Sequence, residues 1–199
     1  MNDLLELSEN NLQKAHKIID ELKIFQNWND LDSACHLVGS VKTGLILHHR
    51  DIDFHVYSND FSIDKSFAAI AAISNNAKIR EAAYKNLLDA EDMCLEWHLQ
   101  YEESPEEIWT IDIIHIKNES PYAGMVERVT DSINRVLTND LRDKILKLKD
   151  ECHQHNARVM GIEIYEAVIE HHIHTLEGLT EWKNKRAKSD ISLWEPKVN

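Results

Sequence analysis

Residues 51 to 57 alternate strictly between polar and apolar side chains, and this segment constrains the fold more than any other. Every second side chain is apolar, in the order Ile52, Phe54 and Val56. Successive side chains of a β-strand point to opposite faces of the sheet, so the pattern predicts a strand with one buried face. The opposite face then carries Asp51 and Asp53 side by side, followed by His55. The chain must therefore build a sheet that buries one face and presents two neighbouring carboxylates on the other.

Further strands are expected on both sides of this segment. A short one is expected over residues 34–38, immediately before Gly39. Two more, over 94–101 and 108–116, are separated by a polar stretch and are expected to form a hairpin. Together with helical segments between them, these strands predict an α/β (α+β) fold, a mixed sheet with flanking helices.

Helical patterns occur before and after the strands. Apolar residues recur at helical spacing over residues 12–25, and the alanine-rich stretch from Ile63 to about Leu88 predicts a long helix broken near Ser74. Beyond Pro121 only helical patterns remain, which predicts a C-terminal helical bundle. We therefore expect an α/β domain over residues 1–120 and a helical domain over residues 121–199 packed on it, because few glycines and prolines leave no long linker.

The paired carboxylates predict a divalent cation. Asp51 and Asp53 repel each other unless a proton or a cation lies between them. Oxygen ligands with little imidazole or thiolate nearby suit Mg²⁺, which takes one or two carboxylates together with substrate phosphates. A third carboxylate is expected in such a site. Asp112 is the favoured candidate because it is a lone acid in an apolar strand, and Glu96 is the alternative.

The turn before the alternating strand predicts a phosphate site. Gly39 allows the backbone to approach a phosphate closely, and the N–H groups that open the next helix attract an anion. The Ser40 hydroxyl can donate a hydrogen bond to the same phosphate. Lys42 follows at two residues and can reach a phosphate as a point charge, although an exposed lysine is the alternative interpretation.

In this order and spacing, Gly39-Ser40 with Gly44, Asp51-Ile52-Asp53 and Asp112 resemble the DNA polymerase beta-like nucleotidyltransferase superfamily over about residues 30 to 118. The resemblance implies a mixed sheet, two divalent ions (Mg²⁺ or Mn²⁺) and transfer of a nucleoside monophosphate from an NTP to an acceptor hydroxyl. By the same resemblance, Gly39 and Ser40 hold the triphosphate, Asp51 and Asp53 bridge the metals, and Asp112 completes the catalytic metal site.

Among small members are the antibiotic-modifying adenylyltransferases and the minimal nucleotidyltransferases of toxin–antitoxin modules, and its acidic balance and short length make the chain look more like these than like polymerases. This implies a nucleotide such as ATP as co-substrate and a small molecule or a protein as acceptor. The alternative is a catalytically inactive module of the same fold that binds a nucleotide or a protein. The sequence decides neither the acceptor nor the base.

Composition limits the expected partners of the protein and its expected location in the cell. The formal net charge of −13, from 35 acidic and 22 basic residues, disfavours a nucleic-acid partner. Three widely spaced cysteines and the lack of a signal or membrane-spanning stretch predict a cytoplasmic protein without a membrane partner, and a homo-oligomer is compatible with the sequence. The group His171, His172 and His174 is interpreted as a solvated helix face, because no cysteine or carboxylate completes a zinc site.

Overall fold

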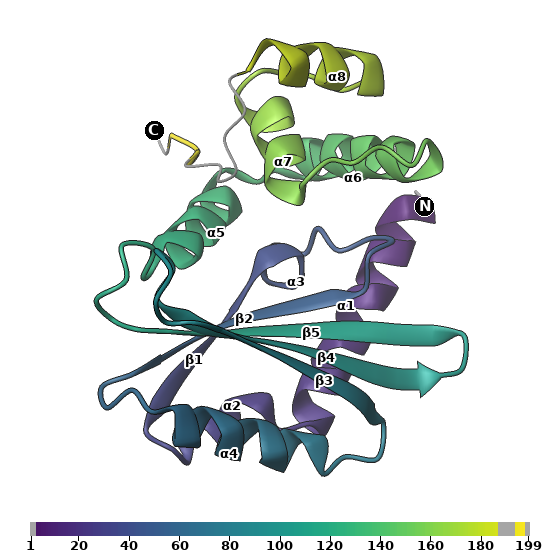
Figure 1. Cartoon of the computed structure of the whole chain (residues 1–199). Helices are drawn as coiled ribbons and strands as arrows, with labels where there is room; N and C mark the ends of the chain where they lie inside the picture. Colours follow the sequence, from purple (N-terminus) through teal and green to yellow (C-terminus); the bar gives the residue numbers. More distant parts are fainter. Residues whose placement is uncertain (1–2, 187–193, 198–199) are drawn as a thin grey trace.

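The alternating segment forms the strand β2 (Asp51–Ser58), in which every second side chain is buried. The computed structural model describes residues 3–186 and 194–197, and within them β2 belongs to a five-stranded sheet (Figure 1). From edge to edge the strands are β1 (Ser33–Val38), β2, β5 (Glu107–Ile116), β4 (Cys94–Ser104) and β3 (Ile79–Leu87). β2 and β5 are parallel, and the other neighbouring strands are antiparallel. The expected mixed sheet and the expected hairpin, β4–β5, are both confirmed.

Three helices cover the buried face of the sheet. They are α1 (Asp3–Glu21), α2 (Ile24–Asn29) and α4 (Ile63–Ser74). Their apolar residues pack with β2, β4 and β5 into one core, in which Trp28, Phe54 and Trp109 are fully buried. Since this core uses one face of β2 and β5, the carboxylates of these strands remain on the opposite face.

The long helix expected from Ile63 to about Leu88 is wrong in its second half. The helix α4 ends at Ser74, and residues 79–87 form β3, which pairs with β4 at the edge of the sheet. Most β3 side chains are exposed on both faces, so this strand lacks the alternation that marks β2. Its alanines favour a helix by intrinsic propensity, and pairing with β4 overrides that preference.

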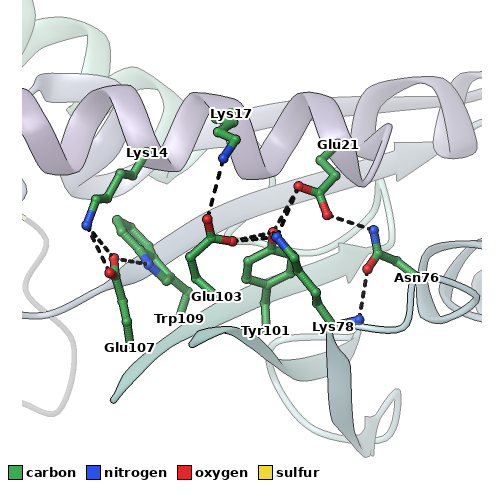
Figure 2. Close-up of polar contacts among 9 residues, drawn as sticks. All are labelled: Lys14, Lys17, Glu21, Asn76, Lys78, Tyr101, Glu103, Glu107 and Trp109. Carbon is green, nitrogen blue, oxygen red and sulfur yellow. Dashed lines mark hydrogen bonds and ion pairs between the residues drawn. The ribbon is translucent and has the colours of Figure 1, made fainter. Parts of the chain in front are cut away.

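Polar contacts fasten α1 to the hairpin (Figure 2). Lys14 Nζ lies 2.8 Å from Glu107 Oε1, and Lys17 pairs with Glu103 one turn further along the helix. At the end of α1, Tyr101 Oη donates to Glu21 Oε2 over 3.0 Å. These contacts fix the helix across the strands β4 and β5.

The remaining helices gather on the other side of the sheet (Figure 1). They are α5 (Met125–Val136), α6 (Asn139–Gln154), α7 (Gly161–Ile169) and α8 (Leu176–Lys185). These helices share a second hydrophobic cluster that includes Ile145, Leu148 and Val168. Among the described residues, no strand follows Ile116, as the sequence predicts. The histidines His171, His172 and His174 lie in the turn and extended segment between α7 and α8, so their interpretation as a helix face is wrong.

Side chains from two helices hold the segment that precedes β2. Asn11 of α1 donates to the Leu47 carbonyl over 2.6 Å, and Lys149 of α6 donates to the Leu45 carbonyl over 2.6 Å. Arg142 of α6 donates to the Gly44 carbonyl. The connection from the turn at Gly39 to β2 is therefore fixed from both sides. Within residues 3–186 and 194–197, no helix combines the length and apolar composition that a membrane crossing requires.

Candidate active site

The three predicted carboxylates lie on two adjacent parallel strands. Asp53 of β2 and Asp112 of β5 are direct register partners, and Asp51 lies two residues before Asp53 on the same face. Glu96 lies one strand further away, on β4, where its register partner is Ile114. The sheet register thus places Asp112, rather than Glu96, next to Asp53.

Burial and mutual repulsion act on the β2 carboxylates. Burial, followed by the charges of Asp112 and Asp51, raises the pKa of Asp53 to about 7. The pKa of Asp51 is also raised, first by burial and then by Asp112. Both carboxylates therefore ionise less readily here than in water, and a divalent cation would stabilise their ionised forms.

Gly39 and Asp53 fit against each other so closely that no side chain fits at position 39. A Cβ built on Gly39 would lie 2.2 Å from Oδ2 of Asp53. The φ angle of Gly39 is +68°, in the left-handed region that glycine adopts without strain. The turn thus brings the backbone of residue 39 directly beside the carboxylate. The helix α3 (Gly39–Thr43) that follows is a single turn, so its dipole is small.

A cavity of about 970 Å³ opens beside these residues. Its polar wall contains Gly39, Ser40, Thr43, Asp51 and Asp53. The opposite wall is built by α5, α7 and the segment before α7, and is largely apolar, with Val129, Ile133, Val159, Ile162 and Tyr165 among its residues. The space between the sheet and the helices can therefore accept a ligand with a charged end and an apolar or aromatic end.

Two of the predicted site residues do not line this cavity. Lys42 is exposed and lines a separate cavity of about 360 Å³, together with His36 and Glu127. Asp112 also does not line the larger cavity, although its register partner Asp53 does. The structure thus brings Gly39, Ser40, Asp51 and Asp53 to one wall, with Asp112 on the adjacent strand.

Lys149 is a residue of the site that the sequence reasoning missed. It lines the large cavity from α6, and its charge lowers the pKa of both Asp51 and Asp53 against the larger effect of burial. A signal for it exists in the sequence. Lys149 falls at helical spacing among Ile145, Leu148 and Cys152, which are buried, so it interrupts the apolar face of its helix.

On the side away from Asp53, Asp112 contacts a residue of β4. Oδ1 of Asp112 lies 2.6 Å from Nδ1 of His98, its register partner on β4. Nε2 of the same ring lies 3.4 Å from Glu96 Oε2, and Lys85 Nζ of β3 lies 3.0 Å from that oxygen. Asp112 and Glu96, the two candidates for the third carboxylate, therefore both contact the ring of His98.

The donor set suits magnesium, although the acids are spread out. Among the described residues, Asp92, Cys94 and Glu96 form the one group of three possible ligands whose ligand atoms all lie within 4.8 Å of one another. Asp51, Asp53 and Asp112 are spaced more widely than that. These three carboxylates therefore do not enclose one ion by themselves, and a cation held between them would need further ligands.

Comparisons with known proteins identify solved structures that are similar to this chain. No family model matches the sequence, and no curated protein matches it. Solved structures do match. The GLD-2/RNP-8 complex aligns with a TM-score of 0.57 and 12% identity, over 81% of this chain and 54% of that one. A mutant of the Cid1 poly(U) polymerase bound to MgATP aligns with a TM-score of 0.57 and 13% identity, over 89% and 53%.

A third solved structure, the complex of the non-canonical poly(A) polymerase GLD-2 with GLD-3, aligns with a TM-score of 0.52 and 10% identity. It covers 97% of this chain and 67% of that one. The chain spans about half the length of the first two proteins. It shares its fold with these solved structures, and this is the mixed sheet with flanking helices that the resemblance of its motifs predicts.

Proposed function

We propose that the protein is a metal-dependent nucleotidyltransferase, which moves a nucleoside monophosphate from an NTP to an acceptor hydroxyl. One observation carries this proposal. Asp51 and Asp53 line the same cavity as Gly39 and Ser40, and Asp112 is the register partner of Asp53. A cavity with two carboxylates beside a glycine turn suits a triphosphate held through divalent cations.

Each residue has a distinct task in this proposal. The backbone N–H groups of residues 39 and 40 and the Ser40 hydroxyl bind the triphosphate. Lys149 approaches from α6 and neutralises part of its charge. Asp51 and Asp53 would hold two Mg²⁺ or Mn²⁺ ions, with Asp112 as the third carboxylate. Bound there, the ions would stabilise the charge that develops on the attacking and leaving oxygens.

The chemical step is an in-line displacement. The acceptor oxygen forms a bond to the α-phosphorus, the bond from that phosphorus to the bridging oxygen breaks, and pyrophosphate leaves. The proton of the acceptor hydroxyl passes to a carboxylate, for which Asp112 is our candidate. The apolar wall of the cavity provides room for the base of the nucleotide and for part of the acceptor.

RNA belongs among the acceptors to be tested. The charge of −13 disfavours nucleic acid, but the similar structures include a poly(U) polymerase and a poly(A) polymerase, so the expectation that nucleic acid is not a partner finds no support there. A small-molecule or protein hydroxyl remains the acceptor that the acidic surface favours. The motifs do not predict which nucleotide base the protein prefers, and binding measurements with the four NTPs are needed to determine it.

The proposal is tested in two stages. Calorimetric titration with ATP, GTP, CTP and UTP, each with and without Mg²⁺, should give metal-dependent binding of at least one nucleotide. Asp53→Asn should abolish this binding, whereas Asp89→Asn, an exposed aspartate in the β3–β4 turn, should not change it. No binding of any nucleotide by the wild-type protein would overturn the proposal.

The second stage follows the label of the α-phosphate. With [α-³²P]NTP and Mn²⁺, we expect pyrophosphate release and label on an acceptor, tested with a short RNA and with the protein itself. Label on an RNA with a free 3′ hydroxyl, but not on one with a blocked end, would identify a terminal transferase. Nucleotide binding without pyrophosphate release from any acceptor would favour the inactive binding module of the same fold.

A further inference from the structure

We propose that His98 is the positioning residue for the third carboxylate of the site. Its Nδ1 atom lies 2.6 Å from Oδ1 of Asp112, and the two residues are direct register partners on β4 and β5. An ionised carboxylate can only accept, so the ring nitrogen donates this hydrogen bond. The contact engages one oxygen of Asp112 and leaves the other for a cation. This inference rests on the proposed function.

A need for such a partner follows from the position of Asp112. Its neighbour on one side is Asp53, whose charge repels it, and its neighbour on the other side is His98. The side chain of Asp112 is 28% exposed, so packing alone does not hold its orientation. A hydrogen-bond donor on the side away from Asp53 fixes the carboxylate before any cation is bound.

His98 is itself held in place by Glu96 on its own strand, which in turn is held from the next strand. Its Nε2 atom lies 3.4 Å from Glu96 Oε2, and the same oxygen pairs with Lys85 Nζ at 3.0 Å. Lys85 and Glu96 are register partners on β3 and β4. A continuous polar chain thus runs across three strands, from Lys85 through Glu96 and His98 to Asp112. Its last member is at the site, and its first is on the exposed edge strand.

This arrangement assigns a role to Glu96 that differs from that of a metal ligand. Partners that orient metal-binding side chains commonly alter metal affinity 10- to 100-fold when they are removed. We therefore expect the loss of His98 to weaken the binding of Mn²⁺ by about tenfold or more. The loss of Glu96 or Lys85 should have smaller effects, in that order, because each acts through its neighbour.

The experiment measures binding of Mn²⁺ alone, by the decrease of the free Mn²⁺ signal in electron paramagnetic resonance. Two polar variants separate the hydrogen bond from the packing of the ring. The amide nitrogen of asparagine can occupy the position of Nδ1, whereas that of glutamine occupies the position of Nε2. His98→Asn should therefore keep the Mn²⁺ affinity within about threefold, and His98→Gln should lose about tenfold.

Gln100→Ala is the matched control, because Gln100 is exposed two residues further along the same face of β4. It should bind Mn²⁺ as the wild type does, and thermal unfolding should show that all three variants are folded. Equal affinities of wild type and His98→Gln would overturn the inference, and so would an equal loss in His98→Asn and His98→Gln. An absence of Mn²⁺ binding in the wild type, even with a non-hydrolysable NTP analogue present to complete the ligands, would instead refute the proposed function on which it rests.

A readout of turnover completes the test once an acceptor is known. If His98 orients Asp112, His98→Gln should raise the Mg²⁺ concentration needed for half-maximal rate, and saturating Mg²⁺ should restore most of the rate. A fall in the maximal rate with no change in the Mg²⁺ requirement would contradict the assignment.

Discussion

Oδ2 of Asp53 occupies the space in which a side chain on Gly39 would have to lie, 2.2 Å from the ideal Cβ position. The residue that is to bind phosphate and the residue that is to bind metal are thus in direct contact. Neither can change size without moving the other. The spacing between the glycine of the turn and the second aspartate of β2 is a consequence of this contact.

Gly39→Ala should therefore destabilise the protein and abolish nucleotide binding. The left-handed backbone alone costs a non-glycine residue about 1 to 2 kcal/mol, and the contact with Asp53 adds to that cost. Urea unfolding measures the loss. Gly161→Ala is the control for stability. Gly161 begins the helix α7, and a Cβ there would meet only ordinary contacts with Tyr165. Equal stability of wild type and Gly39→Ala would contradict the described geometry.

The raised pKa of Asp53 should make stability depend on pH when no metal is present. The folded protein holds this proton up to about pH 7, whereas an unfolded chain releases it near 3.8. Between these values the folded state binds more protons, so stability falls as the pH rises. Asp53→Asn removes this penalty and should be more stable than the wild type at pH 8 by about 1 to 3 kcal/mol.

At pH 4 the two proteins should be nearly equal in stability, because Asp53 is then protonated in both the folded and much of the unfolded state. Urea unfolding in the presence of a chelator, at pH 4, 6 and 8, measures the difference. Mg²⁺ should stabilise the wild type more at pH 8 than at pH 5 and should not stabilise Asp53→Asn. A difference that stays constant over this pH range would contradict the assignment.

Lys149→Met should weaken the binding of a nucleoside triphosphate more than that of a nucleoside. Lys149 is a cation at the cavity wall, and its charge acts on Asp51 and Asp53. We expect a loss of about tenfold or more in triphosphate affinity, which corresponds to about 1.4 kcal/mol. Lys144→Met, on the exposed side of the same helix, is the matched control. A similar loss in both variants would indicate a general effect of charge.

Glu103→Gln tests the contacts that fasten α1 to the hairpin (Figure 2). Hydrogen bonds from Lys78 and Tyr101 lower the pKa of Glu103 to about 2. The stabilisation is therefore present above the unfolded pKa near 4.5 and is lost as the pH falls toward 2. Glu103 and Lys78 are partly exposed, so we expect Glu103→Gln to lower the free energy of unfolding by less than about 1 kcal/mol at pH 7. This loss should be smaller in 1 M salt. Glu106→Gln, in the exposed turn, should have no effect.

The parts of the fold that the sequence predicts correctly are those with one buried and one exposed face. β2 and the hairpin β4–β5 alternate clearly, because one face packs on the core. β3 lies at the edge and is exposed on both faces, so nothing in its pattern distinguishes it from an alanine-rich helix. α1 begins at Asp3, well before the apolar spacing that predicts it from residue 12.

The residues of the candidate site also fall into two groups, those that the sequence predicts and those that it does not. The turn at Gly39 and the aspartates of β2 are close in sequence, and the register of β5 adds Asp112. Lys149 and His98 come from elements whose position relative to β2 depends on tertiary packing, which one sequence does not reveal. Their signals are local and weak: a lysine on an apolar helix face, and a histidine two residues from a glutamate on a strand.

The contacts of α1 with the hairpin join residues that are far apart in the chain, and this affects the rate of folding. Lys14 and Glu107 are 93 residues apart in the chain, and Lys17 and Glu103 are 86 apart. α1 therefore remains without these partners until the hairpin β4–β5 has also formed. Contacts between such distant residues slow folding, because the closure of a long loop precedes any gain from them.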